Sequence, residues 1–390
     1  MLQTNIQAGI AVILTFCFVY YLIPILIKIT CEKKLYDIPD GDRKIHNDFI
    51  SPMGGVALFM GIFLGFSLSG AAENINGLSY LFAGLLMLFF TGLKDDLISI
   101  SANKKLVIEF VSALIVMFGS GILINDFHGV LGISAIPLYL SVPLTFFTII
   151  VIINAYNLID GIDGLSGGVG LVASLFFATG FYAAGNEAMT VLAVITAAAL
   201  LAFLLYNFNP ASIFMGDNGT LVIGFLLAFM TVHYINLQAI NSFSAIFGNA
   251  AAVLPVAFLS VPLYDTFTVV LKRMSRGASP FSPDRDHVHY ELLRMGFTTR
   301  QTALFICLVS IAISLVAIAL SGFNNNIVLF SILGMMVMLL PTNGTKRTIL
   351  KKIGIFNFDL YRLKIIRRRQ NAEPDEYKRW NIPEEMKEAG

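Results

Sequence analysis

Residues 8–29 read AGIAVILTFCFVYYLIPILIKI, an apolar run long enough to cross a lipid bilayer as one helix. A hydrocarbon core of about 30 Å requires roughly 20 apolar helical residues. The run has neither the basic segment nor the small-residue cleavage site of a signal peptide, so we interpret it as a retained span. This stretch therefore predicts a membrane protein.

The composition of the whole chain supports this prediction. Of its 390 residues, 56% are hydrophobic and 13% are charged, and the mean hydropathy is +0.77. Soluble proteins carry roughly 25% charged residues, about twice this content. The composition excludes a soluble enzyme, a disordered chain and a free nucleic-acid-binding protein. We predict an all-α polytopic membrane protein whose partner is the lipid bilayer, with no nucleic acid.

Further apolar runs of helical length follow along the chain. Placing one helix on each run predicts about eleven transmembrane helices, and the loops between them then fall alternately on two sides. The predicted spans lie near residues 8–30, 53–70, 79–93, 106–124, 138–153, 167–184, 189–206, 219–235, 249–271, 302–320 and 327–341.

The positions of the basic residues predict the orientation. The formal net charge is only +1, but all 26 Lys and Arg residues fall on one side or at its border, and none occurs from Leu106 to Leu271. By the positive-inside rule this side is cytoplasmic, so the N-terminus lies outside and the C-terminus inside. We expect a transmembrane catalytic domain over residues 1–345, followed by a basic and then polar cytoplasmic tail over 346–390. Its cytoplasmic loops are 31–52, 94–105, 154–166, 207–218 and 272–301.

Four of these loops carry ionisable residues next to apolar runs. Such groups are costly to hold at a membrane boundary, and where they line a cavity they mark a pathway or a reaction site. Carboxylates gathered on one face suit a divalent metal and phosphoryl transfer, because Mg²⁺ takes one or two carboxylates plus phosphate oxygens. The residues are Asp95 and Asp96 in KDDLISISANKK (94–105), Asn157, Asp160 and Asp163 in NAYNLIDGIDGLS (154–166), Asp217 in NFNPASIFMGDN (207–218), and Arg285, His287 and His289 in SPFSPDRDHVHYELLRMGF (279–297).

Each motif also has a structural alternative. The Asp95–Asp96 pair fits a cap of the next helix or a pair that faces water, and Asp217 before Asn-Gly fits a turn-and-cap element. Asp160 and Asp163 share a face if helical, but their neighbouring glycines equally fit a turn. Asp265, within the apolar run PLYDTFTVVL, is better explained as a hydrogen bonder between packed helices. One of the two histidines, only two residues apart, is expected to be structural. These alternatives do not explain why all four motifs share one side.

A transporter is the alternative from a different class. Acids at the membrane edge and glycine-interrupted helices also occur in cation-coupled carriers. A carrier needs polar groups near the midplane and on both faces, whereas the outer loops hold only Glu73, Asp126 and Glu187 as acids. No P-loop or HExxH motif is present. These observations favour an enzyme of a different kind.

Four blocks in order resemble the polyprenyl-phosphate N-acetylhexosamine-1-phosphate transferases of the MraY/TagO superfamily: GLKDDLISISANKKL, NAYNLIDGIDGLSGG, FMGDNGT and SPFSPDRDHVHY. The similarity runs from about Arg43 to Gln301. The last block is most similar to the branch that uses UDP-N-acetylglucosamine (UDP-GlcNAc), although Tyr290 stands where that branch has its last histidine.

The resemblance implies a reaction and a place. N-acetylglucosamine-1-phosphate would pass from UDP-GlcNAc to undecaprenyl phosphate, releasing UMP and initiating O-antigen, common-antigen or related surface polysaccharide assembly. The active site would face the cytoplasm at a bacterial inner (plasma) membrane. Another UDP-HexNAc donor is the alternative within the family. A homodimer is compatible with the resemblance, and the sequence leaves the oligomeric state open.

The resemblance also implies residue roles, together with Mg²⁺ or Mn²⁺ as cofactor. Phe214 stands where the family stacks an aromatic ring on uracil, which suits a flat base. The implied metal ligands are Asp217 and Asn157. The implied catalytic residues are Asp95, Asp96, Asp160, Asp163 and His287, and the implied substrate-binding residues are Lys105, Asn157, Gly161, Asn207, Phe214, Arg285 and His289.

Overall fold

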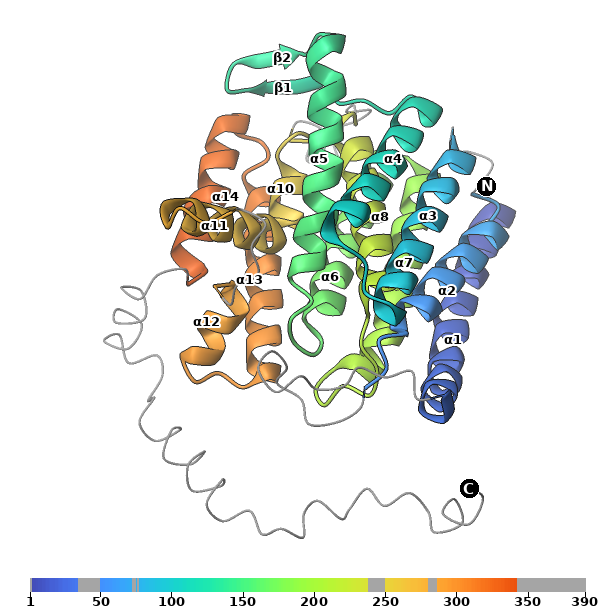
Figure 1. The fold of residues 1–390 in the computed structure, drawn as a ribbon. Coiled ribbons are helices and arrows are strands. Elements are labelled where there is room, and N and C mark those ends of the chain that lie inside the picture. The colour runs from blue at the N-terminus through green and yellow to red at the C-terminus, as the bar shows by residue number, and fades with distance from the viewer. Residues whose placement is uncertain are drawn as a thin grey trace, which may run out of the picture.

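The computed structural model describes residues 2–33, 50–71, 75, 77–237, 250–279 and 286–341 (Figure 1). Most of these residues are helical, because the apolar runs satisfy their backbone hydrogen bonds internally as helices. The helices are α1 (Leu2–Lys33), α2 (Gly54–Leu68), α3 (Leu78–Leu97), α4 (Ala102–Ser120), α5 (Leu138–Leu158), α6 (Leu165–Ala183), α7 (Glu187–Asn207), α8 (Asp217–Ile235), α10 (Leu254–Phe258), α11 (Ser260–Ser275), α12 (Val288–Arg294), α13 (Thr299–Ala319) and α14 (Asn325–Leu339).

The helix bundle confirms the prediction of an all-α polytopic membrane protein. Within the described ranges, seven helices are long and apolar enough to cross a membrane, and α2 and α14 are shorter apolar helices. In the same ranges, the only sheet is a two-stranded hairpin of β1 (Asp126–Val130) and β2 (Ile133–Ala135). The count of eleven spans and the sides of the termini remain predictions.

The predicted span over 249–271 is not one helix. The chain breaks at Leu259 into α10 and α11, and Figure 1 shows α11 lying across the direction of the long helices. Pro262 explains the break, because a proline has no N–H for the helical bond to Phe258 and its ring crowds that carbonyl. The buried residues of α11 include two charged ones, Asp265 and Arg273.

Helix α8 is the most enclosed element among the spans, with 94% of its apolar window buried. Helices α2, α3, α5, α6 and α7 pack against it. Two glycines allow the closest contacts. A Cβ at Gly55 would lie 2.1 Å from the backbone nitrogen of Gly219, and a Cβ at Gly92 would lie 2.4 Å from that of Asn218. Helices α2 and α3 thus touch the backbone at the start of α8 directly.

The predicted cytoplasmic loops gather at one end of the bundle. The connections α3–α4, α5–α6 and α7–α8 lie there together with α12, and the β hairpin lies at the opposite end (Figure 1). The tail over 346–390 and most of loop 31–52 fall outside the described residues. The shared end is where the candidate site is found.

Candidate active site

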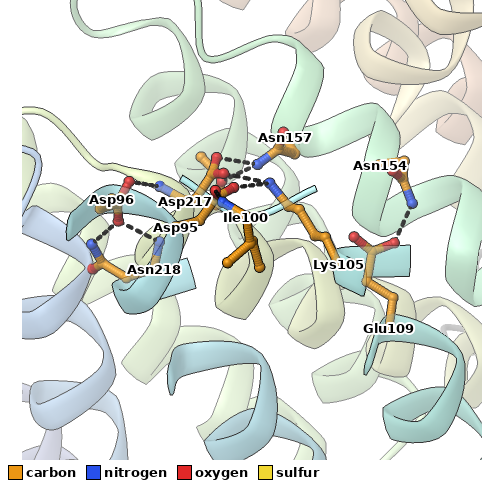
Figure 2. A network of polar contacts seen from close by, with 10 residues as sticks. Asp95, Asp96, Ile100, Lys105, Glu109, Asn154, Asn157, Asp217 and Asn218 are labelled. Carbon is orange, nitrogen blue, oxygen red and sulfur yellow. Dashed lines mark hydrogen bonds and ion pairs between the residues drawn. The ribbon is translucent and has the colours of Figure 1, made fainter. Parts of the chain in front are cut away.

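Asp217 occupies the first position of α8. Gly216 before it has φ 69°, a left-handed conformation that favours glycine. The Asp217 carboxylate accepts a hydrogen bond from Asn157 Nδ2 at 2.9 Å and forms an ion pair with Lys105. Asn157 also donates to Thr220 Oγ1 at 2.6 Å. Side chains of α4 and α5 therefore hold Asp217 (Figure 2). The Asp217 side chain is still 30% exposed, so it remains accessible from solvent.

Asp95 lies beside Asp217 at the end of α3. Its Oδ1 accepts from the backbone N–H of Ile100 at 2.7 Å, and its Oδ2 lies 3.5 Å from Lys105 Nζ. The single ammonium group of Lys105 therefore pairs with two carboxylates. Because these carry more negative charge than one ammonium neutralises, the cluster attracts further positive charge.

Asp96 caps the N-terminus of α8. Its Oδ1 accepts from the backbone N–H of Asp217 and its Oδ2 from that of Asn218, both at 2.9 Å. The Asn218 side chain bonds the same carboxylate and donates to the Pro52 carbonyl at 2.8 Å. A negative charge at this position also stabilises the helix dipole. Asp96 is therefore a cap, but of α8, which begins 121 residues later, and not of the next helix.

Backbone hydrogen bonds fix the loop before α8 against the start of α2. Phe214 N–H donates to the Ser51 carbonyl at 2.8 Å, and Gly54 N–H donates to the Phe214 carbonyl at 2.9 Å. The buried Asn207 accepts from Gly164 N–H and donates to the Ile213 carbonyl, each at 2.9 Å. Its amide therefore ties two site loops together, and its role in substrate binding stays a prediction.

The two aspartates of the α5–α6 connection lie in a turn, not on a helix. Buried Asp163 accepts from Asn209 Nδ2 at 3.2 Å and from Ala211 N–H at 3.1 Å, which holds the loop before α8. Asp160 accepts from Ser166 Oγ at 2.6 Å. Burial raises the pKa of Asp160 to about 6, against the lowering effect of the Ser166 hydroxyl.

The histidine segment meets this turn at Gly161. A Cβ at Gly161 would lie 2.3 Å from His289 Nε2, so only glycine leaves room for the buried ring. Burial lowers the pKa of His289 to about 4, which keeps it neutral near pH 7. The rings of His287 and His289 stack with centroids 5.6 Å apart. Arg285 lies outside the described residues.

Two buried acids were not included in the predicted site. Glu109 lies one turn after Lys105 on α4 and accepts from Asn154 Nδ2 (Figure 2). Asp265 on α11 pairs with His287 Nδ1 at 2.7 Å. Both interrupt apolar runs, and an ionisable residue in such a run is the signal that identifies them.

The donor set fits a magnesium or manganese ion that is shared with a substrate. In the described part of the chain, no three His, Cys, Asp or Glu side chains cluster as a metal site. Asp95 and Asp217 supply two adjacent carboxylates, with the Asn157 amide beside them. Mg²⁺ needs no more than one or two carboxylates when substrate phosphates and waters complete its shell. The Lys105 ammonium shows that a cation is accommodated between these oxygens.

Carboxylates, a lysine and histidines gather at one end of an apolar helix bundle, an arrangement that suits the transfer of phosphate-linked groups at a membrane. Residues 78–235 match the model of glycosyl transferase family 4, a range that contains Asp95, Asp96 and Asp217. The chain belongs to this family, which confirms the resemblance.

Curated relatives extend the similarity over most of the chain. A probable undecaprenyl-phosphate N-acetylglucosaminyl 1-phosphate transferase of Bacillus subtilis is 29% identical, covering 82% of this chain and 87% of the relative. Two undecaprenyl-phosphate alpha-N-acetylglucosaminyl 1-phosphate transferases are similar as well. The Yersinia pestis protein is 30% identical over 75% of this chain and 78% of the relative. The Salmonella typhi protein is 32% identical over 72% and 75%.

Proposed function

We propose that this protein transfers N-acetylglucosamine-1-phosphate from UDP-GlcNAc to undecaprenyl phosphate and releases UMP. The observation that carries the proposal is the Asp95–Lys105–Asp217 cluster at the end of an apolar bundle, where a lipid phosphate and a soluble nucleotide sugar can meet. The names of the relatives support the same acceptor and sugar. The reaction would start a surface polysaccharide, such as O-antigen, on the cytoplasmic face of a bacterial inner membrane.

The reaction exchanges one pyrophosphate bond for another. A phosphate oxygen of the lipid forms a bond to the β-phosphorus of UDP-GlcNAc, and the bond from that phosphorus to UMP breaks. Asp217, helped by Asn157, would hold Mg²⁺ or Mn²⁺, which supplies neutralisation of pyrophosphate charge. Lys105 binds a phosphate oxygen, and Asp95 faces the acceptor phosphate.

The other residues hold these groups in place. Asp96 fixes the start of α8 and therefore the position of Asp217. Asp163 and Asn207 hold the loop that carries Phe214, whose ring would stack on uracil. In phosphoryl transfer, positioning and charge neutralisation supply most of the rate, so this scaffold suits the reaction.

The test is UMP release by the purified full-length protein. We expect UMP from UDP-GlcNAc only when undecaprenyl phosphate and Mg²⁺ are both present, and less from UDP-GalNAc or UDP-MurNAc-pentapeptide. Asp217→Asn should abolish release, whereas the same change at Asp126, in the hairpin at the opposite end, should leave it intact. Absence of UMP with a lipid preparation that supports a known transferase would refute the proposal.

A further inference from the structure

A side-chain contact between α4 and α5 lies one helical turn from the carboxylate cluster. Glu109 of α4 is 1% exposed, and its Oε2 accepts from Asn154 Nδ2 of α5 at 2.5 Å (Figure 2). Asn154 Nδ2 also donates to the Ile150 carbonyl of its own helix at 3.0 Å. Both hydrogens of this amide are therefore engaged, which fixes its orientation toward Glu109. In the described part of the chain, no other side-chain hydrogen bond joins α4 directly to α5.

This contact repeats the arrangement that holds Asp217. Lys105 and Glu109 are four residues apart on α4, so they lie on one face of that helix. Asn154 and Asn157 are three residues apart on α5 and likewise share a face. Lys105 and Asn157 both hold the Asp217 carboxylate. The bond from Asn154 to Glu109 joins the same two helix faces about one turn, or roughly 5 Å, further along.

Helix α5 is fixed relative to Asp217 by close packing on α8. A Cβ at Gly224 of α8 would lie 3.0 Å from Ile153 Cα, so the two backbones are in direct contact. Helix α4, in contrast, is connected to α5 through the β hairpin, at the end of the bundle opposite Lys105 (Figure 1). At the end that carries Lys105, the side-chain bond between α4 and α5 is therefore the polar contact that fixes α4 against α5.

We propose that Glu109 is a positioning residue that keeps the Lys105 ammonium on the Asp217 carboxylate. The inference rests on the proposed function, in which Asp217 holds the cation and Lys105 binds a substrate phosphate oxygen. With α4 held by Asn154, the ammonium occupies Asp217 in the absence of substrate and is in place for a phosphate oxygen when substrate binds. This role requires a hydrogen-bond acceptor at position 109 and not a negative charge.

Mn²⁺ binding in the absence of substrate tests this role. Glu109→Leu removes the acceptor for Asn154, whereas Glu109→Gln keeps an acceptor and removes only the charge. Electron paramagnetic resonance of the full-length protein in nanodiscs should show that Glu109→Leu binds Mn²⁺ about 3- to 5-fold more tightly than Glu109→Gln, because the ammonium no longer pairs with Asp217. General damage to the site would weaken Mn²⁺ binding, so tighter binding distinguishes positioning from loss of structure.

UMP release tests the same role in the presence of substrate. Glu109→Leu should lower kcat/KM for UDP-GlcNAc about 10- to 100-fold, the effect of losing one hydrogen bond from a charged donor. Glu109→Gln should stay close to the parent protein. In the Lys105→Met background, Glu109→Leu should change neither the Mn²⁺ affinity nor kcat/KM further, because both substitutions remove the same function.

Two control variants separate positioning from packing. Phe110, the next residue of α4, contacts Phe146 of α5 edge to face with ring centroids 5.0 Å apart. Phe110→Leu should lower the unfolding temperature and leave the Mn²⁺ affinity unchanged. Replacing Glu109 and Asn154 together by leucine creates an apolar pair, so this double variant should be as stable as the parent. It should still show tighter Mn²⁺ binding and reduced kcat/KM.

Three results would overturn the inference. They are Mn²⁺ binding in Glu109→Leu no tighter than in Glu109→Gln, a Glu109→Gln variant as slow as Glu109→Leu, or a further effect of Glu109→Leu in the Lys105→Met background. If Glu109→Leu alone does not fold, the double leucine variant provides the same comparison. Failure of the parent protein to release UMP counts against the proposed function, whereas the Mn²⁺ measurements test the link from Glu109 to Lys105 without substrate.

Discussion

Replacing Asp96 by asparagine tests whether this carboxylate is the cap of α8. Its two oxygens accept the N–H groups of Asp217 and Asn218, both at 2.9 Å. Asparagine retains one acceptor, so one N–H at the buried helix start loses its partner, which costs about 1–3 kcal/mol. Loss of the charge at the helix N-terminus adds about 0.3–1 kcal/mol. We therefore expect a loss of about 2–3 kcal/mol.

Thermal unfolding of the purified protein in one detergent measures this loss. Between 2 and 4 °C per kcal/mol is typical of large chains, so the unfolding temperature should fall by about 4–12 °C. Glu32→Gln makes the same carboxylate-to-amide change in an exposed ion pair and should shift it by less than about 1 °C. If Asp96 instead faced substrate as a free carboxylate, its neutralisation would relieve repulsion within the acidic cluster. An unchanged or higher unfolding temperature would therefore refute the capping role.

Three other perturbations have defined outcomes. Burial raises the pKa of Asp160 to about 6, so its contribution to stability is full below about pH 4 and is lost as the pH rises through 6. Asp160→Asn should remove this loss of about 3 kcal/mol, seen as a stability difference from the parent that grows from pH 4 to pH 7; a pH-independent difference would contradict it. Gly161→Ala should displace His289 and cost about 1–3 kcal/mol in thermal unfolding, with UMP release reduced; parent-like values would contradict the contact. Lys105→Met should tighten Mn²⁺ binding in the absence of substrate, measured by electron paramagnetic resonance, because the ammonium no longer occupies the Asp217 carboxylate; weaker binding would show that the lysine does not compete with the ion.

Hydropathy was sufficient to predict the polytopic helical fold, because long apolar runs have few alternatives in a membrane. The break at Leu259 escaped this prediction although the sequence signals it. Pro255 and Pro262 both lie inside the run over 249–271, and a proline there ends or kinks a helix. Hydropathy averages over such residues, so it reports that a run is apolar and not that it is continuous.

The candidate site was predicted as a set of residues and not as a set of contacts. Four motifs on one side of the membrane indicated that Asp95, Asn157 and Asp217 would meet, and the structure joins them. The sequence does not show which of Asp95 and Asp96 is the helix cap, because the cap formed by Asp96 depends on a packing contact across 121 residues. The sequence predicts that Asp265 forms a hydrogen bond between packed helices. Its partner is an imidazole, which no local pattern identifies.

The enclosure of α8 has a consequence for the order in which a nascent chain acquires its chemistry. Of the helices that pack against it, α2, α3, α5, α6 and α7 precede it in the sequence and the short α10 follows it, so most of its partners have been synthesised when α8 emerges. Docking of α8 closes the cluster around Asp217. Asp265 and His287 are translated afterwards, so the carboxylate half of the centre is complete before the imidazole half exists. A nascent chain that has emerged only as far as residue 237 would be an intermediate with the cation site and without the histidine pair.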